Sequence, residues 1–225
     1  MAMASNFRRV FTSSVGTKLL IGLTGLALFA YLILHLAGNA LIFLGQDTFN
    51  EYSHTLISNP LIVPIEIGLL LIFLLHVYKA AAMWIANQSA RPVRYQKKSR
   101  AGHTSRKSLA SSTMIVTGTV TLLFVMIHVK QFKYGAYYAT AGNPIVRDLY
   151  RTEVDVFHHA AWVAFYVICT ALVALHLRHG IASGFQSIGV DHPLYTRRLV
   201  TWGIIGAIVV GGGLAVIPLL VYLTT

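Results

Sequence analysis

The sequence is poor in charge, in acidic residues and in cysteine. Only 11% of its 225 residues are charged, against about 25% in soluble domains. With 56% apolar residues and a mean hydropathy of +0.65, this excludes a disordered chain and an ordinary soluble domain. The single cysteine, Cys169, excludes a disulfide framework and a CxxC metal site. Because Cys169 lies inside an apolar run, we expect it to be a small core residue.

Five apolar runs are long enough to cross a hydrocarbon core about 30 Å thick. They lack the alternation of a β-barrel, so helices are the expected spanning form. The first run is too long for a signal peptide and has no clear cleavage site. The sequence therefore predicts a single all-α membrane domain with spans at residues 19–44, 61–86, 109–130, 156–177 and 199–223.

The orientation follows from the uneven distribution of Lys and Arg. Thirteen of them fall in the N-terminal arm and the loops after spans two and four, and four fall near the opposite ends. Residues 45–60, expected to be a loop, carry none. The bias predicts a cytoplasmic N-terminus. Because the cations lie between spans, we expect an acidic soluble partner or membrane lipid to meet them, and no nucleic acid.

Four of the ten histidines lie inside the first four spans, one in each: His35, His76, His128 and His176. Ionisable residues are costly within a membrane and indicate function there. Position along antiparallel spans converts to depth at about 1.5 Å per residue. That conversion places His35 and His128 toward the outside and His76 and His176 toward the cytoplasm. Two histidine pairs at two depths are the pattern that two bis-histidine b haems need, with all four imidazoles as ligands of haem iron.

Two dipeptides repeat at the same spacing. Thr24-Gly25 and Thr117-Gly118 each precede the outer histidine of their span, with ten residues from glycine to histidine. Each glycine should lie near the level of the inner pair and leave room for a haem, and Gly68 could do the same for the outer haem. Ordinary packing of small residues between helices is the alternative.

These residues resemble the cytochrome b membrane anchor of succinate dehydrogenase and fumarate reductase, in its single-chain, five-helix, two-haem form. The resemblance rests on the order and spacing of four segments over nearly the whole chain. They are 35–39 (HLAGN), 76–78 (HVY), 127–129 (IHV), and His176 with Gly180 and the run to Gly189-Val190.

The resemblance implies an electron-transfer and anchor subunit of the bacterial cytoplasmic membrane that is not an enzyme on its own. A flavoprotein subunit with FAD and an iron-sulfur subunit would bind its cytoplasmic face. Electrons would pass from the iron-sulfur subunit through the inner haem b and then the outer haem b to a quinone, with menaquinone expected. By position, His76 and His176 would ligate the inner haem, and His35 and His128 the outer one.

Further site residues match the family less closely. Ser187 stands where some relatives place a residue near an inner haem propionate. Arg178 and Lys79 are cations at suitable depth, although snorkelling to the membrane surface is an alternative role for both. Glu66, the only acid within a span, could exchange a proton with quinone or could be an interfacial carboxylate.

Two other functions fit parts of the pattern. One is another quinone-linked two-haem cytochrome, such as the membrane subunit of respiratory nitrate reductase, in which the last helix supplies ligands. The absence of histidine after His192 argues against it. The other is a transporter with histidine relays, which would need discontinuous helices and a polar pathway.

Overall fold

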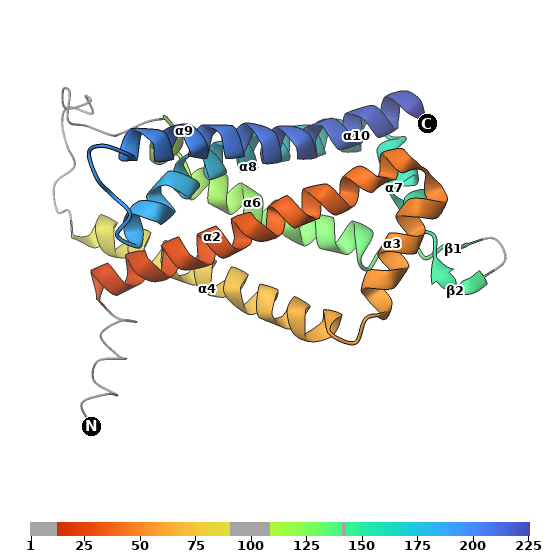
Figure 1. The fold of residues 1–225 in the computed structure, drawn as a ribbon, viewed down its shortest axis with the longest axis horizontal. Coiled ribbons are helices and arrows are strands. Elements are labelled where there is room, and N and C mark those ends of the chain that lie inside the picture. The colour runs from red at the N-terminus through yellow and green to blue at the C-terminus, as the bar shows by residue number, and fades with distance from the viewer. Residues whose placement is uncertain (1–12, 91–108, 141–142) are drawn as a thin grey trace.

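The computed structural model describes residues 13–90, 109–140 and 143–225. Five of its helical segments are long and apolar enough to cross a membrane, as expected of an all-α membrane protein. They lie side by side along one long axis (Figure 1). These five segments are Ser14–Leu44, Ile62–Ser89, Met114–Phe132, Ala160–Ser187 and Thr196–Thr224.

The first four segments are built from long continuous helices. The first consists of α2 (Ser14–Asn39) and a short 3-10 turn, η1 (Ala40–Leu44). The others are α4 (Ile62–Ser89), α6 (Met114–Phe132) and α8 (Ala160–Ser187). The Ser13 hydroxyl starts α2 by accepting a hydrogen bond from the Gly16 amide at 3.0 Å.

The fifth segment contains three helical pieces, α9 (Thr196–Gly206), the π-helical η2 (Ala207–Gly212) and α10 (Gly213–Thr224). Its glycines allow close contact with α8. A Cβ atom at Gly211 would lie only 2.4 Å from that of Ala174. Close backbone approach at small residues is the usual way in which helices pack in membranes.

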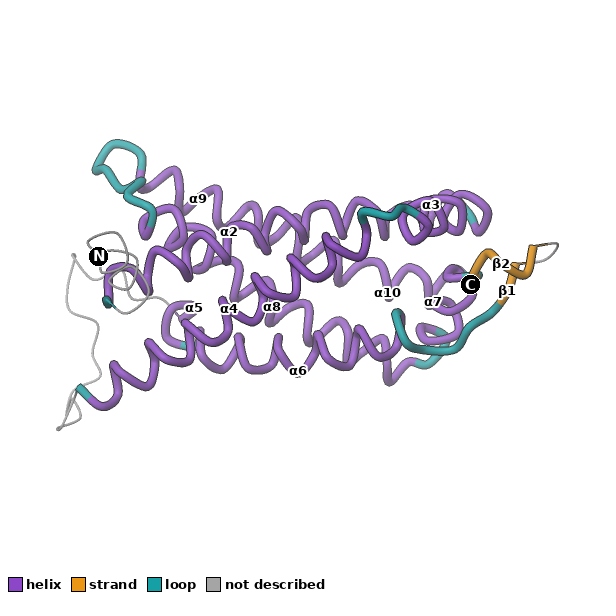
Figure 2. The backbone as a smooth tube through the Cα atoms, turned by 90° about the horizontal axis from the view of Figure 1, so that it is seen from below, coloured by secondary structure: helices purple, strands orange, loops and turns teal. Residues whose placement is uncertain are grey.

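One end of the bundle carries additional secondary structure, and we call it the hairpin end. It contains α3 (Gln46–Ser58), α7 (Leu149–Phe157) and the antiparallel strands β1 (Ala139–Thr140) and β2 (Asn143–Arg147). We call the opposite end, where α2 begins, the N-terminal end; the short helix α5 (Leu109–Ser112) lies there (Figure 2).

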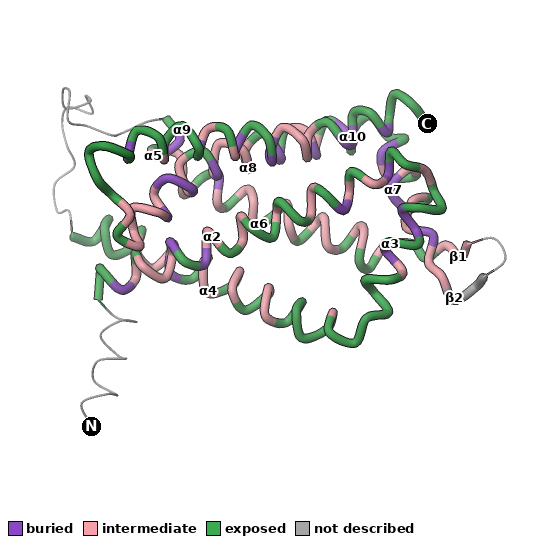
Figure 3. Tube along the Cα trace, in the orientation of Figure 1, coloured by how far each residue is buried: buried purple, intermediate pink, exposed green. Residues whose placement is uncertain are grey.

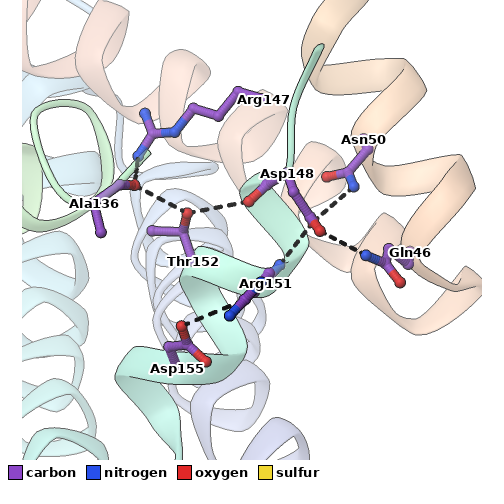
Figure 4. A network of polar contacts seen from close by, with 8 residues as sticks. All are labelled: Gln46, Asn50, Ala136, Arg147, Asp148, Arg151, Thr152 and Asp155. Carbon is purple, nitrogen blue, oxygen red and sulfur yellow. Dashed lines mark hydrogen bonds and ion pairs between the residues drawn. The ribbon is translucent and has the colours of Figure 1, made fainter. Parts of the chain in front are cut away.

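A polar cluster around Asp148 joins α3 to α7 (Figure 4). The Asp148 carboxylate accepts hydrogen bonds from Gln46 Nε2 at 2.6 Å and Asn50 Nδ2 at 2.8 Å. It also caps α7 by accepting from the Arg151 amide at 3.0 Å. The Arg147 guanidinium donates to the carbonyl oxygen of Ala136 at 3.0 Å. The contacts of Asp148 hold α3 and α7 together at the hairpin end.

The expected spans are confirmed in number, and they differ in extent; the largest difference is at the end of the fourth span, which continues to Ser187 and not to residue 177. The segment expected to be a loop, residues 45–60, contains the mostly polar helix α3. The third span starts at Met114, since the chain breaks from helical geometry at Thr113 and leaves α5 separate. The fourth starts at Ala160, because α7 ends at Phe157 and the backbone is extended at His159.

Burial is uneven among the five segments (Figure 3). Helix α8 is central and buries nine residues, including Cys169, which is 5% exposed as expected of a core residue. Helix α4 buries only Lys79 and α6 buries only Thr117. Protein packing is therefore concentrated on α2, α8 and the last segment.

Candidate haem-binding histidine pairs

The structure brings His76 of α4 and His176 of α8 together inside the bundle. Their ring centroids are 6.5 Å apart, and the ring planes are inclined by 72°. Both residues are half-buried. The pairing expected from depth along the sequence is therefore present as a contact between two imidazoles on facing helices.

A threonine holds each imidazole of this pair. Thr24 Oγ1 of α2 lies 3.1 Å from His76 Nδ1, and Thr117 Oγ1 of α6 lies 3.1 Å from His176 Nδ1. The Thr24 hydroxyl donates its proton to the Leu20 carbonyl at 2.6 Å, and the Thr117 hydroxyl donates to the Thr113 carbonyl at 3.1 Å. Each threonine oxygen is thus left to accept from the Nδ1–H of a neutral imidazole. This fixes the tautomer in which Nε2 carries the free lone pair for a metal.

The glycine after each threonine lies against the same imidazole. A Cβ atom on Gly25 would be 3.1 Å from His76 Cε1, and one on Gly118 would be 3.2 Å from His176 Cε1. The expected level of these glycines is correct. Their neighbour is the edge of the imidazole, however, so the missing side chains make room first for the ring that the threonine orients. At Gly68 a Cβ atom would meet nothing within 4 Å.

His35 of α2 and His128 of α6 form the second pair, toward the hairpin end. Their ring centroids are 5.6 Å apart, and the planes are nearly perpendicular at 83°. Polar contacts to this pair are long: Tyr31 Oη lies 3.4 Å from His35 Nδ1, and Asn39 Nδ2 lies 3.4 Å from His35 Nε2. Among the described residues, His128 Nδ1 is buried without a hydrogen-bond partner.

Aromatic side chains surround His128 instead of hydrogen-bonding groups. Phe132, Phe124 and Tyr166 have ring centroids 5.2, 5.8 and 6.0 Å from that of His128. The Tyr166 hydroxyl donates to Gln131 Oε1 at 2.7 Å, which satisfies its polar end within the cluster. Packing holds the ring of His128 in place, but no hydrogen bond among the described residues fixes its tautomer.

The two pairs lie at different levels of the bundle. On α2, the residue that contacts His76 is Thr24, eleven positions before His35. On α6, the residue that contacts His176 is Thr117, also eleven positions before His128. Eleven residues of α-helix span about 16 Å. The two helices α2 and α6 therefore give the same separation between the levels of the two pairs.

The donor chemistry of both pairs fits a metal with two axial imidazoles. A bond from imidazole nitrogen to a transition metal is about 2 Å long, so two rings on one ion have centroids about 6 Å apart. The observed separations of 5.6 and 6.5 Å bracket this value. Within the described residues no three His, Cys, Asp or Glu side chains converge as a zinc or copper site would require. Helices α4 and α6 bury only one residue each, so protein side chains cover little of their surfaces. The half-buried imidazoles on these helices suit a large planar group that would cover them.

Lys79 and Arg178, the expected cations near a propionate, have different surroundings. Arg178 is exposed, which agrees with a snorkelling side chain. Lys79 is 8% exposed, three residues after His76 on α4, and its ammonium lies 5.6 Å from the centroid of the Tyr78 ring. Lys79 is the one buried residue of α4, and its role near a propionate stays a prediction.

Ser187 and Glu66 also have partners in the structure. The Ser187 hydroxyl donates to the Ser183 carbonyl at 2.7 Å, and its Cβ packs against Gly22 of α2. Glu66 is exposed near the hairpin end of α4 and forms an ion pair with Lys133, which directly follows α6. Contact with a propionate or a quinone stays a prediction for both residues.

Comparison of the chain with protein-family models, with curated proteins and with solved structures finds no match. The geometry of the two histidine pairs is therefore the strongest indication of function.

Proposed function

We propose that this chain is a di-haem cytochrome b, and that it is the membrane anchor of a succinate:quinone oxidoreductase. The observation that carries the first part is the presence of two facing histidine pairs, drawn from four spanning helices, at levels about 16 Å apart. The bound haems would supply one-electron redox centres at two depths.

The residues of the chain have separable roles in this proposal. His76 and His176 hold one haem, and Thr24 and Thr117 orient them through Nδ1. The buried Lys79 ammonium lies on the same helix as His76, one turn further on, where it can pair with a propionate.

His35 and His128 hold the second haem within the aromatic side chains of Phe124, Phe132 and Tyr166. The Glu66–Lys133 ion pair, on the same half of the bundle, can exchange a proton with a quinone bound nearby. The sequence resemblance supports the identification of the partners as a flavoprotein and an iron-sulfur subunit.

Under this proposal the N-terminal end faces the bacterial cytoplasm and carries the soluble subunits. The basic loop from Arg91 to Lys107, like Arg8 and Arg9, lies outside the described residues, so the charge bias of the sequence alone supports this orientation. Proteases added to the outside of intact cells should leave the loop uncut, and cleavage there would invert the topology.

Haem stoichiometry is the direct test of the central claim. A pyridine haemochrome assay on the purified full-length chain should give two haem b per polypeptide, with b-type bands in the reduced-minus-oxidised spectrum. One haem or none contradicts the proposal, and a transporter that uses the histidines as proton relays would show no such bands. Mass spectrometry of co-purified proteins tests the wider assignment, which predicts a flavoprotein and an iron-sulfur protein.

A further inference from the structure

A stripe of exposed residues runs along the outer face of α9, at the N-terminal end of the bundle. Leu194, Arg197, Arg198, Thr201, Trp202 and Ile205 line a surface depression with a volume of about 450 Å³. The opposite face of α9 packs on α8: Gly203 is buried, and a Cβ atom there would lie 3.3 Å from the Arg178 carbonyl. The residues of the stripe are exposed, on the side of α9 away from its contact with α8.

Two arginines at the start of the stripe form no ion pair with a carboxylate of the residues that the structure describes. The ion pairs in the described part of the chain join Lys133 to Glu66 and Arg151 to Asp155, all toward the hairpin end. Arg197 and Arg198 are exposed neighbours, and both line the depression. Two exposed arginines that line one depression favour a ligand that carries phosphate, which arginine binds through paired hydrogen bonds.

The depth of these arginines indicates where that phosphate comes from. The segment Thr196–Thr224 has 29 residues, about 43 Å of helix, against a hydrocarbon core of roughly 30 Å. Its far end is apolar, with Leu219, Leu220 and Leu223 exposed, so the excess length falls at the arginine end. Arg197 and Arg198 then lie at the level of the lipid headgroups.

The rest of the stripe suits acyl chains. Trp202 is 65% exposed, one turn after Arg198, where a tryptophan commonly lies at the membrane interface. Ile205, Ile208 and Val209 continue the exposed apolar surface into the span. A soluble protein could reach the arginines but not this apolar continuation.

We propose that the stripe from Leu194 to Ile205 is a binding site for an anionic phospholipid. Arg197 and Arg198 bind its phosphate, Trp202 contacts the glycerol region, and the acyl chains lie along Ile205, Ile208 and Val209. The site is separate from both histidine pairs, and it does not depend on haem binding.

The test is native mass spectrometry of the full-length, delipidated protein titrated with phosphatidylglycerol or with phosphatidylcholine of the same acyl chains. The wild type should bind at least one phosphatidylglycerol in clear preference to phosphatidylcholine. The variant Arg197→Gln/Arg198→Gln should lose roughly thirtyfold in affinity for phosphatidylglycerol, the share expected of two arginines at an anionic surface. Trp202→Ala should weaken binding of both lipids.

The control variant Lys130→Gln/Arg151→Gln removes the same charge at the hairpin end. It should leave affinity for phosphatidylglycerol unchanged, and circular dichroism should show equal helix content in all variants. Equal binding of the two lipids by the wild type, or equal losses in the two double variants, overturns the proposal. If the Arg197→Gln/Arg198→Gln variant keeps its lipid but no longer co-purifies with soluble subunits, the stripe is a protein-docking surface instead.

Discussion

The two histidine pairs are alike in their ligands and different in what holds them. His76 and His176 each have Nδ1 at 3.1 Å from a threonine oxygen and a glycine against the ring edge. His35 and His128 have long or absent polar partners among the described residues and are surrounded by aromatic rings instead. Hydrogen bonds therefore orient the imidazoles of the His76–His176 pair, and aromatic packing holds the imidazole of His128 in the other pair.

The ends of the bundle repeat this contrast. At the hairpin end, α3 and α7 are joined by the Asp148 cluster, and a hydrophobic core that contains Phe49, Phe157 and Tyr166 contacts the ring of His128 through Tyr166. Around the His76–His176 pair, the closest support comes from side chains of the spanning helices themselves. The His35–His128 pair should therefore depend on the packing of the hairpin end. The His76–His176 pair should depend on the hydroxyl groups of Thr24 and Thr117.

The largest expected effect comes from removing a ligand. His76→Leu and His176→Leu should each eliminate one haem of two, and it should be the same haem, because bis-histidine ligation makes a pair act as a unit. His35→Leu and His128→Leu should both eliminate the other. Haem content and low-temperature spectra of the four variants measure this.

These four variants also test the pairing itself. The haem held by His35 and His128 should still be present in the His76→Leu protein, and the reverse should hold as well. If His35→Leu and His76→Leu remove the same haem, ligation runs between neighbouring helices, and the contacts between the facing rings have no functional meaning.

The next largest effect concerns a carboxyl buried at the hairpin end. Glu153 of α7 is 5% exposed, and burial raises its pKa from 4.5 to about 8. Between these values the folded protein keeps Glu153 protonated, whereas the unfolded chain ionises it. Stability should therefore fall as pH rises from about 4.5 to 8, by up to about 1.4 kcal/mol per pH unit.

Thermal unfolding in detergent, monitored at pH 5 to 8.5, measures that slope. Glu153→Gln should flatten it and should unfold at a higher temperature than the wild type at pH 8. Glu51→Gln, which changes an exposed carboxylate of α3, is the matched control and should keep the wild-type slope. A slope that survives Glu153→Gln would assign the pH dependence to another group.

A smaller loss is expected when the cluster between α3 and α7 is broken. Asp148→Ala removes the cap of α7 and leaves Gln46 and Asn50 without their acceptor, which should cost about 2 to 3 kcal/mol. Asp155→Ala breaks an exposed ion pair with Arg151 and a surface hydrogen bond with Tyr138, and should cost about 1 kcal/mol or less. On heating, the Asp148→Ala protein should lose the haem of the His35–His128 pair first; simultaneous loss of both haems would show that the two ends are not independent.

The sequence predicts the elements whose signal is local. Five apolar runs predict five spans, and position along the runs predicts which histidines meet, because antiparallel helices convert residue number into depth. Helix α3 was missed because residues 46–58 are mostly polar and carry no long apolar run. The break at Thr113 is not predicted, because the amino-acid composition does not change between residues 109–112 and the helix that begins at Met114.

The surroundings of the ligands were predictable only in part. The repeated Thr-Gly pairs were visible, but hydrogen bonding of threonine to an imidazole on another helix depends on helix rotation, which composition does not determine. Tyr31, Phe124 and Tyr166 had no signal among many apolar and aromatic residues. Glu153 was missed because it stands in a polar stretch, and its burial arises from the packing of α7 across the bundle.

The smallest and sharpest test of the contrast between the two sites is the removal of a single hydroxyl. An acceptor at Nδ1–H makes an imidazole a stronger electron donor, which favours ferric iron and lowers the reduction potential. Thr24→Val and Thr117→Val keep the shape of the side chain but remove the acceptor. Each should raise the potential of the haem at the His76–His176 pair by roughly 40 mV, the equivalent of one hydrogen bond of about 1 kcal/mol. Tyr31→Phe, which removes only a 3.4 Å contact, should shift the other haem by much less. Potentiometric titration separates the two haems, and Thr24→Ser should restore the wild-type value. If Thr24→Val and Tyr31→Phe move their respective haems equally, the two sites are not held in different ways, and the hydrogen bonds that the threonines accept from the imidazoles are incidental to the redox chemistry.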